Sequence, residues 1–532
     1  MKKKKQEKEE RLAILTPWLQ EQIKDTSGFA EPPEEILPAL NQLHVNLFHR
    51  KNTEASQLLA TMLDKQTVRR VVFDILLKFG LIDKDADRFL VLAGIDEQFS
   101  QRVLDNVKEI SAFEGDDQRE QLGDLYSFSI DDEETSDIDD ALSVEFLEDR
   151  TRVGIHIADV SHYIKRGDLL DKEASQRVTS IYLPSRTVNM FPKELSQGLA
   201  SLLEGELRPS MTCWADFDAE GTMIDWRVSE TAITVTRRLS YNYVDALLAG
   251  EEEDEELLEK VEYLNELAIK LQEKRLENGA AVFNKPELKI RVKEGEVTVK
   301  EGRKDSASRF LVSEFMVLGN SVTALYAARN DVPMIYRTQD KPEGLPELDP
   351  LHYDPVLFDK AIRCMKRSRL SLHPSSHGGL GVDFYTQVTS PIRRFTDLVL
   401  QRQVSAHLRG EKIPYEADEL MKVLANADSI GNEVKDVQRS SESYWLHEYI
   451  RRNTLSEEIE ATVVSNAQGG YFVELDETYN RIKMASQEKL MASDRVLLSI
   501  DKVNSEKGFI NVTFKELLDR PEQDEEGTED DQ

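Results

Sequence analysis

The stretch DLYSFSIDDEETSDIDDALSVEF, residues 124–146, decides the fold, because two strand-forming segments enclose a run of acidic residues. Apolar and polar residues alternate through Tyr126, Phe128 and Ile130, and the segment ALSVEF continues the strand pattern after the acids. Between the two segments, residues 131–140 hold seven acids and no base. The sequence therefore predicts a sheet with a concentrated negative charge at its edge.

Four aspartates of this run, Asp131, Asp137, Asp139 and Asp140, repel one another unless a cation compensates them. Hard carboxylate oxygens of this kind suit Mg²⁺, or alternatively Mn²⁺. The competing interpretation is an acidic surface loop that binds nothing. Because strand patterns flank the run on both sides, we expect it at the edge of a framework, and both interpretations stay open at this point.

A second segment, TSPIRRFTDLVLQRQ at residues 389–403, has the signals of a helix start. Ser390 is a favoured N-cap and Pro391 a favoured first helical residue, so we expect Arg393 and Arg394 in the first turn. The helix dipole disfavours cations there, and an anion such as a phosphate would compensate them. The alternative is a simple Arg393–Asp397 pair along the helix.

The remainder of the 532-residue chain divides by pattern into several units. Residues 1–115 have helical periodicity, notably in 66–82 and 98–112, and we expect a helix-turn-helix-like module or a plain packing domain. Strands and helices, among them 311–328, mix up to about residue 455, and 457–517 have the short strands of a closed β-barrel. The acidic tail, 519–532, is expected to be disordered.

The formal net charge of −32, from 68 Lys and Arg against 100 Asp and Glu, argues at first against a nucleic-acid partner. The segments 131–140, 251–260 and 519–532 account for −20 of it, so the total excludes nothing. The segment 251–277 is expected to be a solvated charged helix. The run KAIRCMKRSR, 360–369, holds five bases and no acid, and is either a polyanion groove on one helix face (Lys360, Arg363, Arg367) or a solvated helix.

Cysteine content and hydropathy indicate the compartment. Only Cys213 and Cys364 occur, too few for a disulfide framework, and this favours a reducing cytoplasm. No uninterrupted apolar run approaches the roughly 18 residues that a membrane span needs. The charged N-terminus, MKKKKQEKEER, lacks the apolar core of a signal peptide. We therefore expect a cytoplasmic protein without disulfide or membrane partners.

Taken together, these motifs resemble the RNB domain of the RNase II/RNase R exoribonucleases. The resemblance begins in residues 124–143 and continues through further segments in the family's order. These are HIADVSHYI (156–164), SIYLPSRTVNMFPKELSQGLASL (180–202), RFLVSEFMVLGN (309–320) and HGGLGVDFYTQVTSPIRRFTDLVLQR (377–402). The resemblance implies an α+β fold, with a mixed α/β RNB domain at 120–455 and an S1-type OB barrel at 457–517.

The resemblance also implies processive 3′→5′ hydrolysis of single-stranded RNA to nucleoside 5′-monophosphates. By position, Asp131, Asp137 and Asp140 match the family's metal-binding aspartates, and Asp139 matches the aspartate needed for cleavage but not for RNA binding. Arg393 matches the arginine at the scissile phosphate. The substrate-binding residues implied or suggested are Tyr182, which matches the tyrosine that packs on the terminal base, Arg394, Tyr471 and Phe472.

The N-terminal region departs from the family, because the well-studied bacterial members have two cold-shock OB-folds where this chain has helical patterns. Three other functions stay open at this point. The first is a catalytically silent RNA-binding regulator on the same fold, and the second is a transcription or ribosome-associated regulator that acts through its N-terminal helices. The third is a metal-dependent phosphohydrolase for small molecules.

Overall fold

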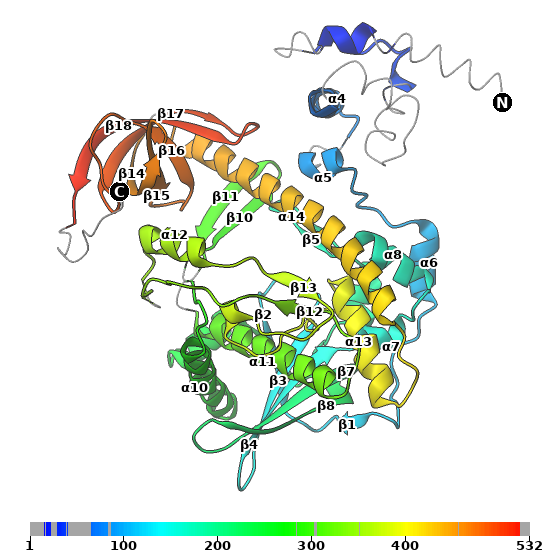
Figure 1. Ribbon diagram of the computed structural model, residues 1–532. Coiled ribbons are helices and arrows are strands. Elements are labelled where there is room, and N and C mark those ends of the chain that lie inside the picture. Colours follow the sequence, from blue (N-terminus) through cyan, green and yellow to red (C-terminus); the bar gives the residue numbers. More distant parts are fainter. Residues whose placement is uncertain are drawn as a thin grey trace.

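A seven-stranded sheet forms the centre of the molecule. The structure is a computed structural model, and it describes residues 15, 17–22, 29–38, 40, 65–82, 87–283, 285–302, 306–349, 352–455 and 457–521. The strand order is β1-β8-β7-β4-β3-β2-β9 (Figure 1). Its strands are β1 (Glu120–Leu122), β2 (Ser127–Asp131), β3 (Asp140–Phe146), β4 (Thr151–Ala158), β7 (Leu207–Phe217), β8 (Met223–Thr234) and β9 (Arg237–Ser240). The two predicted strands around the acidic run are therefore confirmed as β2 and β3.

Helices cover the sheet, and its middle strands are therefore buried along most of their length. Helix α11 (Ala307–Arg329) packs against β4, β7 and β8, and α10 (Glu255–Glu277) contacts β3 and α11. Gly319 of α11 lies against Ile155 of β4, and an added Cβ would stand 3.2 Å from the nearest Ile155 methyl carbon. This close approach fixes α11 on the sheet. The helices predicted at 311–328 and within 251–277 are both confirmed.

Helix α11 is also long and apolar enough, by length and composition alone, to cross a membrane. Half of its most apolar window is buried inside the molecule, however, and Leu311, Phe315 and Val322 belong to the hydrophobic core. Its apolar character is therefore accounted for by packing against the central sheet.

Further helices and two-stranded sheets surround this centre. The helices are α7 (Val160–Tyr163), α8 (Leu169–Arg177), a π-helix (Glu194–Leu199), α9 (Tyr241–Leu248), α12 (Pro355–Cys364), a 3₁₀ turn (Gly378–Leu380) and α13 (Phe395–Leu408). The small sheets pair β5 (Ile181–Tyr182) with β6 (Thr187–Val188), β10 (Leu288–Lys293) with β11 (Glu296–Glu301), and β12 (Tyr336–Thr338) with β13 (Arg369–Ser371). Because α12 ends at Cys364, the expectation that Arg367 shares a helix face with Lys360 and Arg363 is wrong.

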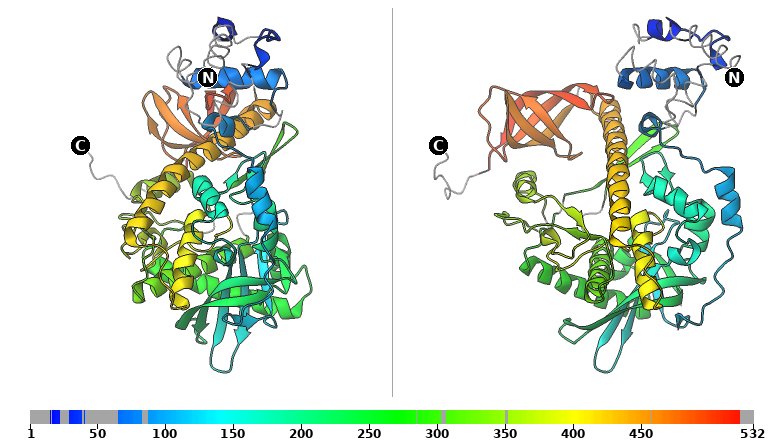
Figure 2. Two further views of the ribbon diagram at one scale, coloured as in Figure 1. Left: turned by 90° about the vertical axis from the view of Figure 1, so that its right-hand side faces the viewer. Right: turned by 45° about the vertical axis from the view of Figure 1, so that its right-hand side comes forward.

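The long helix α14 (Ala417–Asn453) runs from the half of the molecule built on the central sheet to a separate C-terminal sheet (Figures 1 and 2). That sheet has five antiparallel strands in the order β16-β15-β14-β17-β18, and its edge strands β16 and β18 approach each other. The strands are β14 (Glu458–Ala467), β15 (Gly470–Leu475), β16 (Arg481–Ala485), β17 (Arg495–Asn504) and β18 (Phe509–Asp519). It encloses its own hydrophobic core, which Ile450 at the end of α14 joins.

The N-terminal region contributes α4 (Lys65–Lys78), α5 (Arg88–Ala93) and α6 (Gln101–Lys108), so helices lie where periodicity predicted them in 66–82 and 98–112. Most of residues 1–64, and with them the helix-turn-helix-like expectation, lie outside the described residues. The same holds for residues 522–532 of the acidic tail. Arg520 at the start of that segment pairs with the buried Asp494 of the C-terminal sheet at 2.7 Å, and β18 extends to Asp519, so the strand pattern ends later than predicted.

Candidate active site

The acidic run 131–140 forms the connection between β2 and β3, and it brings four aspartates together at the end of these strands. Asp131 is the last residue of β2 and Asp140 the first of β3. One Asp131 oxygen accepts hydrogen bonds from the Asp132 amide at 2.7 Å and the Thr135 hydroxyl at 2.9 Å. The strand ends and this turn thus place the carboxylates close enough to influence one another's ionisation.

Asp139 is the most deeply placed of the four, with 4% of its surface exposed. One of its oxygens accepts the Ile392 amide at 3.0 Å and the other accepts Nε of Arg393 at 3.1 Å. Arg393 also donates to the Ser390 hydroxyl at 3.0 Å. The sequence motifs around residues 139 and 393, which lie 254 positions apart, therefore meet in one pair.

Burial governs the ionisation of these carboxyl groups. It raises the pKa of Asp139 to about 7 against the lowering effect of Arg393, and it raises the pKa of Asp140 to about 7 with further contributions from Asp139 and Asp131. Burial also raises the pKa of Asp131 and Asp137. The cluster thus carries more potential negative charge than Arg393 alone compensates.

Tyr182 of β5 lies beside this cluster, next to Asp137 and Arg393. Burial of its hydroxyl raises the pKa of Tyr182, and Asp137 raises it further, so the phenol stays neutral at physiological pH. The residue as a whole nevertheless exposes 38% of its surface. The tyrosine thus has its hydroxyl at the carboxylates and part of its ring accessible.

The donors of the cluster fit a hard divalent cation in kind, since all are carboxylate oxygens with excess negative charge. Within the described residues, however, no group of three or more His, Cys, Asp or Glu side chains is arranged to hold a metal ion. Asp139, for example, is turned toward Arg393. The fit therefore rests on donor type and proximity, and not on a preformed set of three ligands.

The helix after Pro391 begins later than the sequence predicts. Helix α13 starts at Phe395, so Arg393 and Arg394 precede it and the first-turn expectation is wrong. The cause is tertiary pairing, because Arg394 forms a β-bridge with Thr179 and the Arg393 carbonyl accepts the Ser180 amide at 2.9 Å. These contacts hold Arg394 extended, at φ −135° and ψ 122°. The anion that Arg393 contacts in this structure is Asp139.

Arg394 has a different partner from its neighbour. Its guanidinium donates to Asp397 at 2.6 and 2.9 Å, and the same carboxylate oxygen accepts the Ser390 amide at 3.0 Å. Asp397 is fully buried. The Arg393–Asp397 pair, which the sequence left open as the alternative to anion binding, does not form, because Arg393 contacts Asp139 and Arg394 contacts Asp397. The expected contact of Arg394 with substrate stays a prediction.

Sequence reasoning missed a ring of cations around the acidic connection. Lys289 of β10 contacts Asp132 at 2.8 Å, Arg309 of α11 contacts the same oxygen at 2.5 Å, and Arg291 contacts Glu134 at 2.5 Å. The Arg309 guanidinium also lies 4.0 Å from the centre of the Tyr241 ring. Only Arg309 fell within a segment that resembles the family, and isolated bases such as Lys289 gave no signal.

The two aromatic residues expected to contact RNA in the C-terminal sheet lie differently from one another. Tyr471 and Phe472 are consecutive in β15, so their side chains point to opposite faces. The Tyr471 hydroxyl donates to the Glu488 carbonyl at 2.9 Å and accepts the Leu490 amide at 3.0 Å, and its ring packs on the sheet's core. Phe472 is 39% exposed and is the accessible aromatic of the pair.

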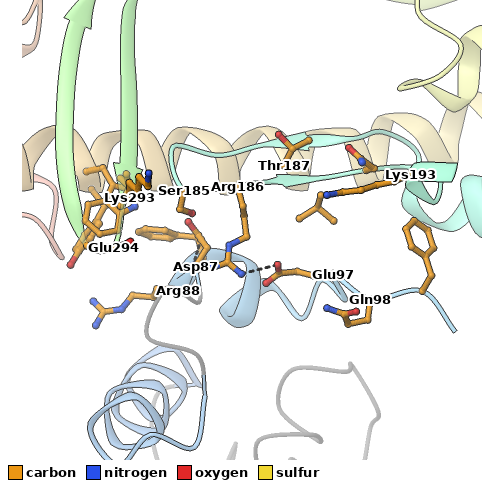
Figure 3. Close-up of a pocket in the computed structure, with 18 of the residues that line it drawn as sticks. Asp87, Arg88, Glu97, Gln98, Ser185, Arg186, Thr187, Lys193, Lys293 and Glu294 are labelled. Carbon is orange, nitrogen blue, oxygen red and sulfur yellow. Dashed lines mark hydrogen bonds and ion pairs between the residues drawn. The ribbon is translucent and has the colours of Figure 1, made fainter. Parts of the chain in front are cut away.

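A cavity of about 760 Å³ lies away from the carboxylates, between α5, the β10–β11 hairpin and the segment after β5 (Figure 3). None of the predicted site residues lines it. Its charges are largely paired, since Arg186 contacts Glu97 at 3.1 Å and Arg88 pairs with Asp74 and Glu506. We interpret it as the space between the N-terminal helices, the segment after β5, the β10–β11 hairpin and α14.

Comparison with known proteins identifies the family of this chain. The family model described as the RNB domain matches residues 119–348 and 345–410. An uncharacterized ribonuclease of Synechocystis is 35% identical over 71% of this chain and 58% of its own length. Ribonuclease R of Aquifex aeolicus is 31% identical over 68% of this chain and 56% of its own length. The chain thus spans somewhat more than half the length of these curated relatives.

Solved structures share the fold at low sequence identity. Mycoplasma genitalium RNase R, in complex with ribose-methylated single-stranded RNA, superposes with a TM-score of 0.72 at 20% identity, over 80% of this chain and 77% of that one. Yeast Ssd1, described as a pseudonuclease, gives a TM-score of 0.61 at 17% identity, over 79% of this chain and 58% of that one. The fold therefore occurs in both an RNase and a pseudonuclease.

Proposed function

This chain belongs to the RNB-domain family, and we propose that it is an exoribonuclease that degrades single-stranded RNA processively from the 3′ end and releases nucleoside 5′-monophosphates. The observation that carries the proposal is the Asp139–Arg393 pair among three further aspartates. Ribonucleases among its relatives support the activity class. The direction of hydrolysis, its processivity and its products are part of the proposal.

In the proposed mechanism, Arg393 stabilises negative charge on the scissile phosphate, a contribution that grows where water is excluded. When RNA arrives, the phosphate competes with Asp139 for the guanidinium. Burial raises the pKa of Asp139 to about 7 while the carboxyl is paired with Arg393, so this group can exchange a proton near neutral pH. Tyr182 exposes part of its ring and would stack on the terminal base, a contact that tolerates any sequence.

Asp131, Asp137 and Asp140 would hold Mg²⁺, or alternatively Mn²⁺. Such an ion would supply Lewis-acid activation of a water and charge neutralisation at the leaving oxygen. The excess negative charge of the four carboxylates supports this assignment, because a divalent cation would relieve their mutual repulsion.

We further propose that the C-terminal sheet is an S1-type OB-fold that binds single-stranded RNA. Five antiparallel strands around a separate core, with the exposed Phe472 on β15, support this role. The protein would act in cytoplasmic RNA degradation.

The test compares the wild type with Asp139→Asn on a 5′-labelled single-stranded RNA, with Mg²⁺ and with EDTA. We expect the wild type to leave short labelled ends and to spare a matched DNA strand. Asp139→Asn should lose hydrolysis by at least a hundredfold and keep RNA affinity within a few fold, because the amide preserves shape but not charge. Full hydrolysis by this variant would refute the site assignment.

The second candidate function is a catalytically silent RNA-binding regulator. The structural similarity to a pseudonuclease supports this alternative. The presence of all four aspartates around Arg393 favours the enzyme. A wild-type chain that binds RNA but does not shorten it with either metal would establish this second function.

A further inference from the structure

A second cavity, of about 360 Å³, is lined by Arg394, the neighbour of Arg393, and by none of the four aspartates of the cluster. Arg393 lies in the turn that precedes this position, whereas Arg394 is extended and bridges to Thr179. Arg393 reaches Asp139, whereas Arg394 lines the cavity. Two consecutive residues thus contribute to the proposed reaction centre and to a second, cationic cavity.

Arg337 of β12 is the unusual residue in this cavity. Its Nε atom is buried and has no hydrogen-bond partner, and among the described residues we find no carboxylate paired with its guanidinium. Burial lowers the pKa of Arg337, and Arg394 lowers it further, while Tyr385, Asp397 and Asp428 act in the opposite direction without reversing the shift. A guanidinium in this position would be stabilised by an anion that enters the cavity.

The other lining residues also suit an oxyanion. Lys435 of α14 adds a second cation, while Arg394 is already compensated by Asp397. Asp428 is the acidic residue of the lining, so Arg337 and Lys435 leave one positive charge in excess. The amide of Gln387 supplies a neutral donor, and Gln438 lines the cavity while its Nε2 donates to the Tyr182 carbonyl at 3.2 Å.

We propose that this cavity binds the phosphate group of a nucleoside 5′-monophosphate, which is the product class of the proposed hydrolysis. This inference rests on the proposed function. A newly released nucleotide carries a phosphate that the nearby carboxylates repel, and the cavity offers it donors and positive charge one residue away from Arg393. The site would therefore hold product, and product at this site would inhibit the enzyme.

Equilibrium binding tests the proposal without hydrolysis, in the full chain carrying Asp139→Asn. We expect 5′-AMP and inorganic phosphate to bind by titration calorimetry, and adenosine not to bind. Arg337→Gln should weaken AMP binding at least tenfold. The matched control, Arg439→Gln, removes an exposed arginine of α14 that pairs with Asp436 and does not line the cavity, and should leave AMP binding unchanged.

Adenosine that binds as tightly as AMP, or AMP binding that is unaffected by Arg337→Gln, would overturn the proposal. Phosphate that binds as well as AMP would support a site that recognises the phosphate group alone, and AMP that binds more tightly would support a nucleotide site. Lys435→Gln changes an exposed position on α14 and keeps the test valid if Arg337→Gln fails to fold; it should weaken AMP binding several-fold.

Exonuclease assays separate this inference from the proposed function. If the wild type hydrolyses RNA and AMP does not bind, the inference fails alone. If AMP binds through Arg337 but no condition yields hydrolysis, the proposed function fails and the anion site remains.

Discussion

At the scale of single residues, two buried aspartates each pair with an arginine, and the two ion pairs have different roles. Asp139 contacts Arg393, whose side chain is 45% exposed, so a phosphate can reach this arginine and displace the contact. Asp397 contacts Arg394 in a fully buried position and also accepts the Ser390 amide. The first pair is placed for chemistry and the second holds the start of α13.

Arg394→Gln should therefore act mainly on stability. It leaves Asp397 buried without its cation, and breaking a buried pair in this way costs about 3–5 kcal/mol. We expect urea unfolding to show a loss of this size. Arg393→Gln is the matched control, with a smaller loss of stability and a larger loss of hydrolysis. Equal effects of the two variants on stability would contradict the distinction.

The pKa values of Asp139 and Asp140 predict how stability depends on pH. Both are raised to about 7 from an ordinary value near 3.8, so the folded chain binds more protons than the unfolded chain between these pH values. Stability is then greatest at the acidic end and falls as pH rises toward and through about 7. Because the two groups are coupled, the titration belongs to the pair.

We expect the metal-free chain to unfold at lower urea concentration at pH 8 than at pH 5.5, as far as these groups contribute. The Asp139→Asn, Asp140→Asn double variant should reduce this difference, and added Mg²⁺ should restore stability at pH 8 in the wild type. The same pH dependence in the double variant and the wild type would assign it to other groups.

At the scale of elements, the β10–β11 hairpin ties the active-site connection to the rest of the fold. Lys289 and Arg309 both contact Asp132, the neighbour of Asp131, and the Val292 amide of β10 donates to the Pro184 carbonyl at 2.8 Å. One hairpin thus contacts both the acidic connection and the segment that follows Tyr182. The hairpin therefore fixes the position of the acidic connection relative to the segment that follows Tyr182.

Asp132→Asn should loosen this connection without removing any proposed metal ligand. We expect the Mg²⁺ concentration for half-maximal hydrolysis to rise several-fold, while RNA affinity stays within twofold. Glu148→Gln, an exposed position in the β3–β4 turn, is the control and should leave both values unchanged. An unchanged metal dependence in Asp132→Asn would show that the ion pairs do not position Asp131.

At the scale of the whole molecule, α14 connects the carboxylate cluster to the C-terminal sheet. Gln438 of this helix donates to the Tyr182 carbonyl at 3.2 Å, and Ile450 near its end packs into the core of that sheet. The helix thus fixes the distance between the proposed site of hydrolysis and the proposed RNA-binding sheet (Figure 1).

Phe472→Ala and Tyr471→Phe should therefore separate binding from stability in the C-terminal sheet. Removing the exposed Phe472 ring should weaken single-stranded RNA binding by about 1–3 kcal/mol, the contribution of stacking on one base, with little effect on stability. Tyr471→Phe loses the hydroxyl's two backbone contacts and should cost about 1 kcal/mol of stability. Unchanged RNA affinity in Phe472→Ala would contradict the role of β15.

The sequence by itself determined the features that depend on neighbours in the chain. Alternation predicted β2 and β3, periodicity predicted helices in 66–82 and 98–112, and the acidic run between two strands predicted carboxylates at the end of a sheet. The order of motifs identified the family, which the RNB model match confirms. The spacing of apolar side chains and the local charge can be read directly from neighbouring residues, so these predictions did not depend on long-range contacts.

Only the tertiary structure decided how distant segments share partners. Ser390 and Pro391 have the local signals of a helix start, yet pairing of Arg394 with Thr179 delays the helix to Phe395. The same pairing directs Arg393 to Asp139 and Arg394 to Asp397. Lys289 and Arg337 gave no signal as isolated bases. The residues around Lys289 and Arg337 come from segments far away in the chain, so only the tertiary structure shows which charges lie near them.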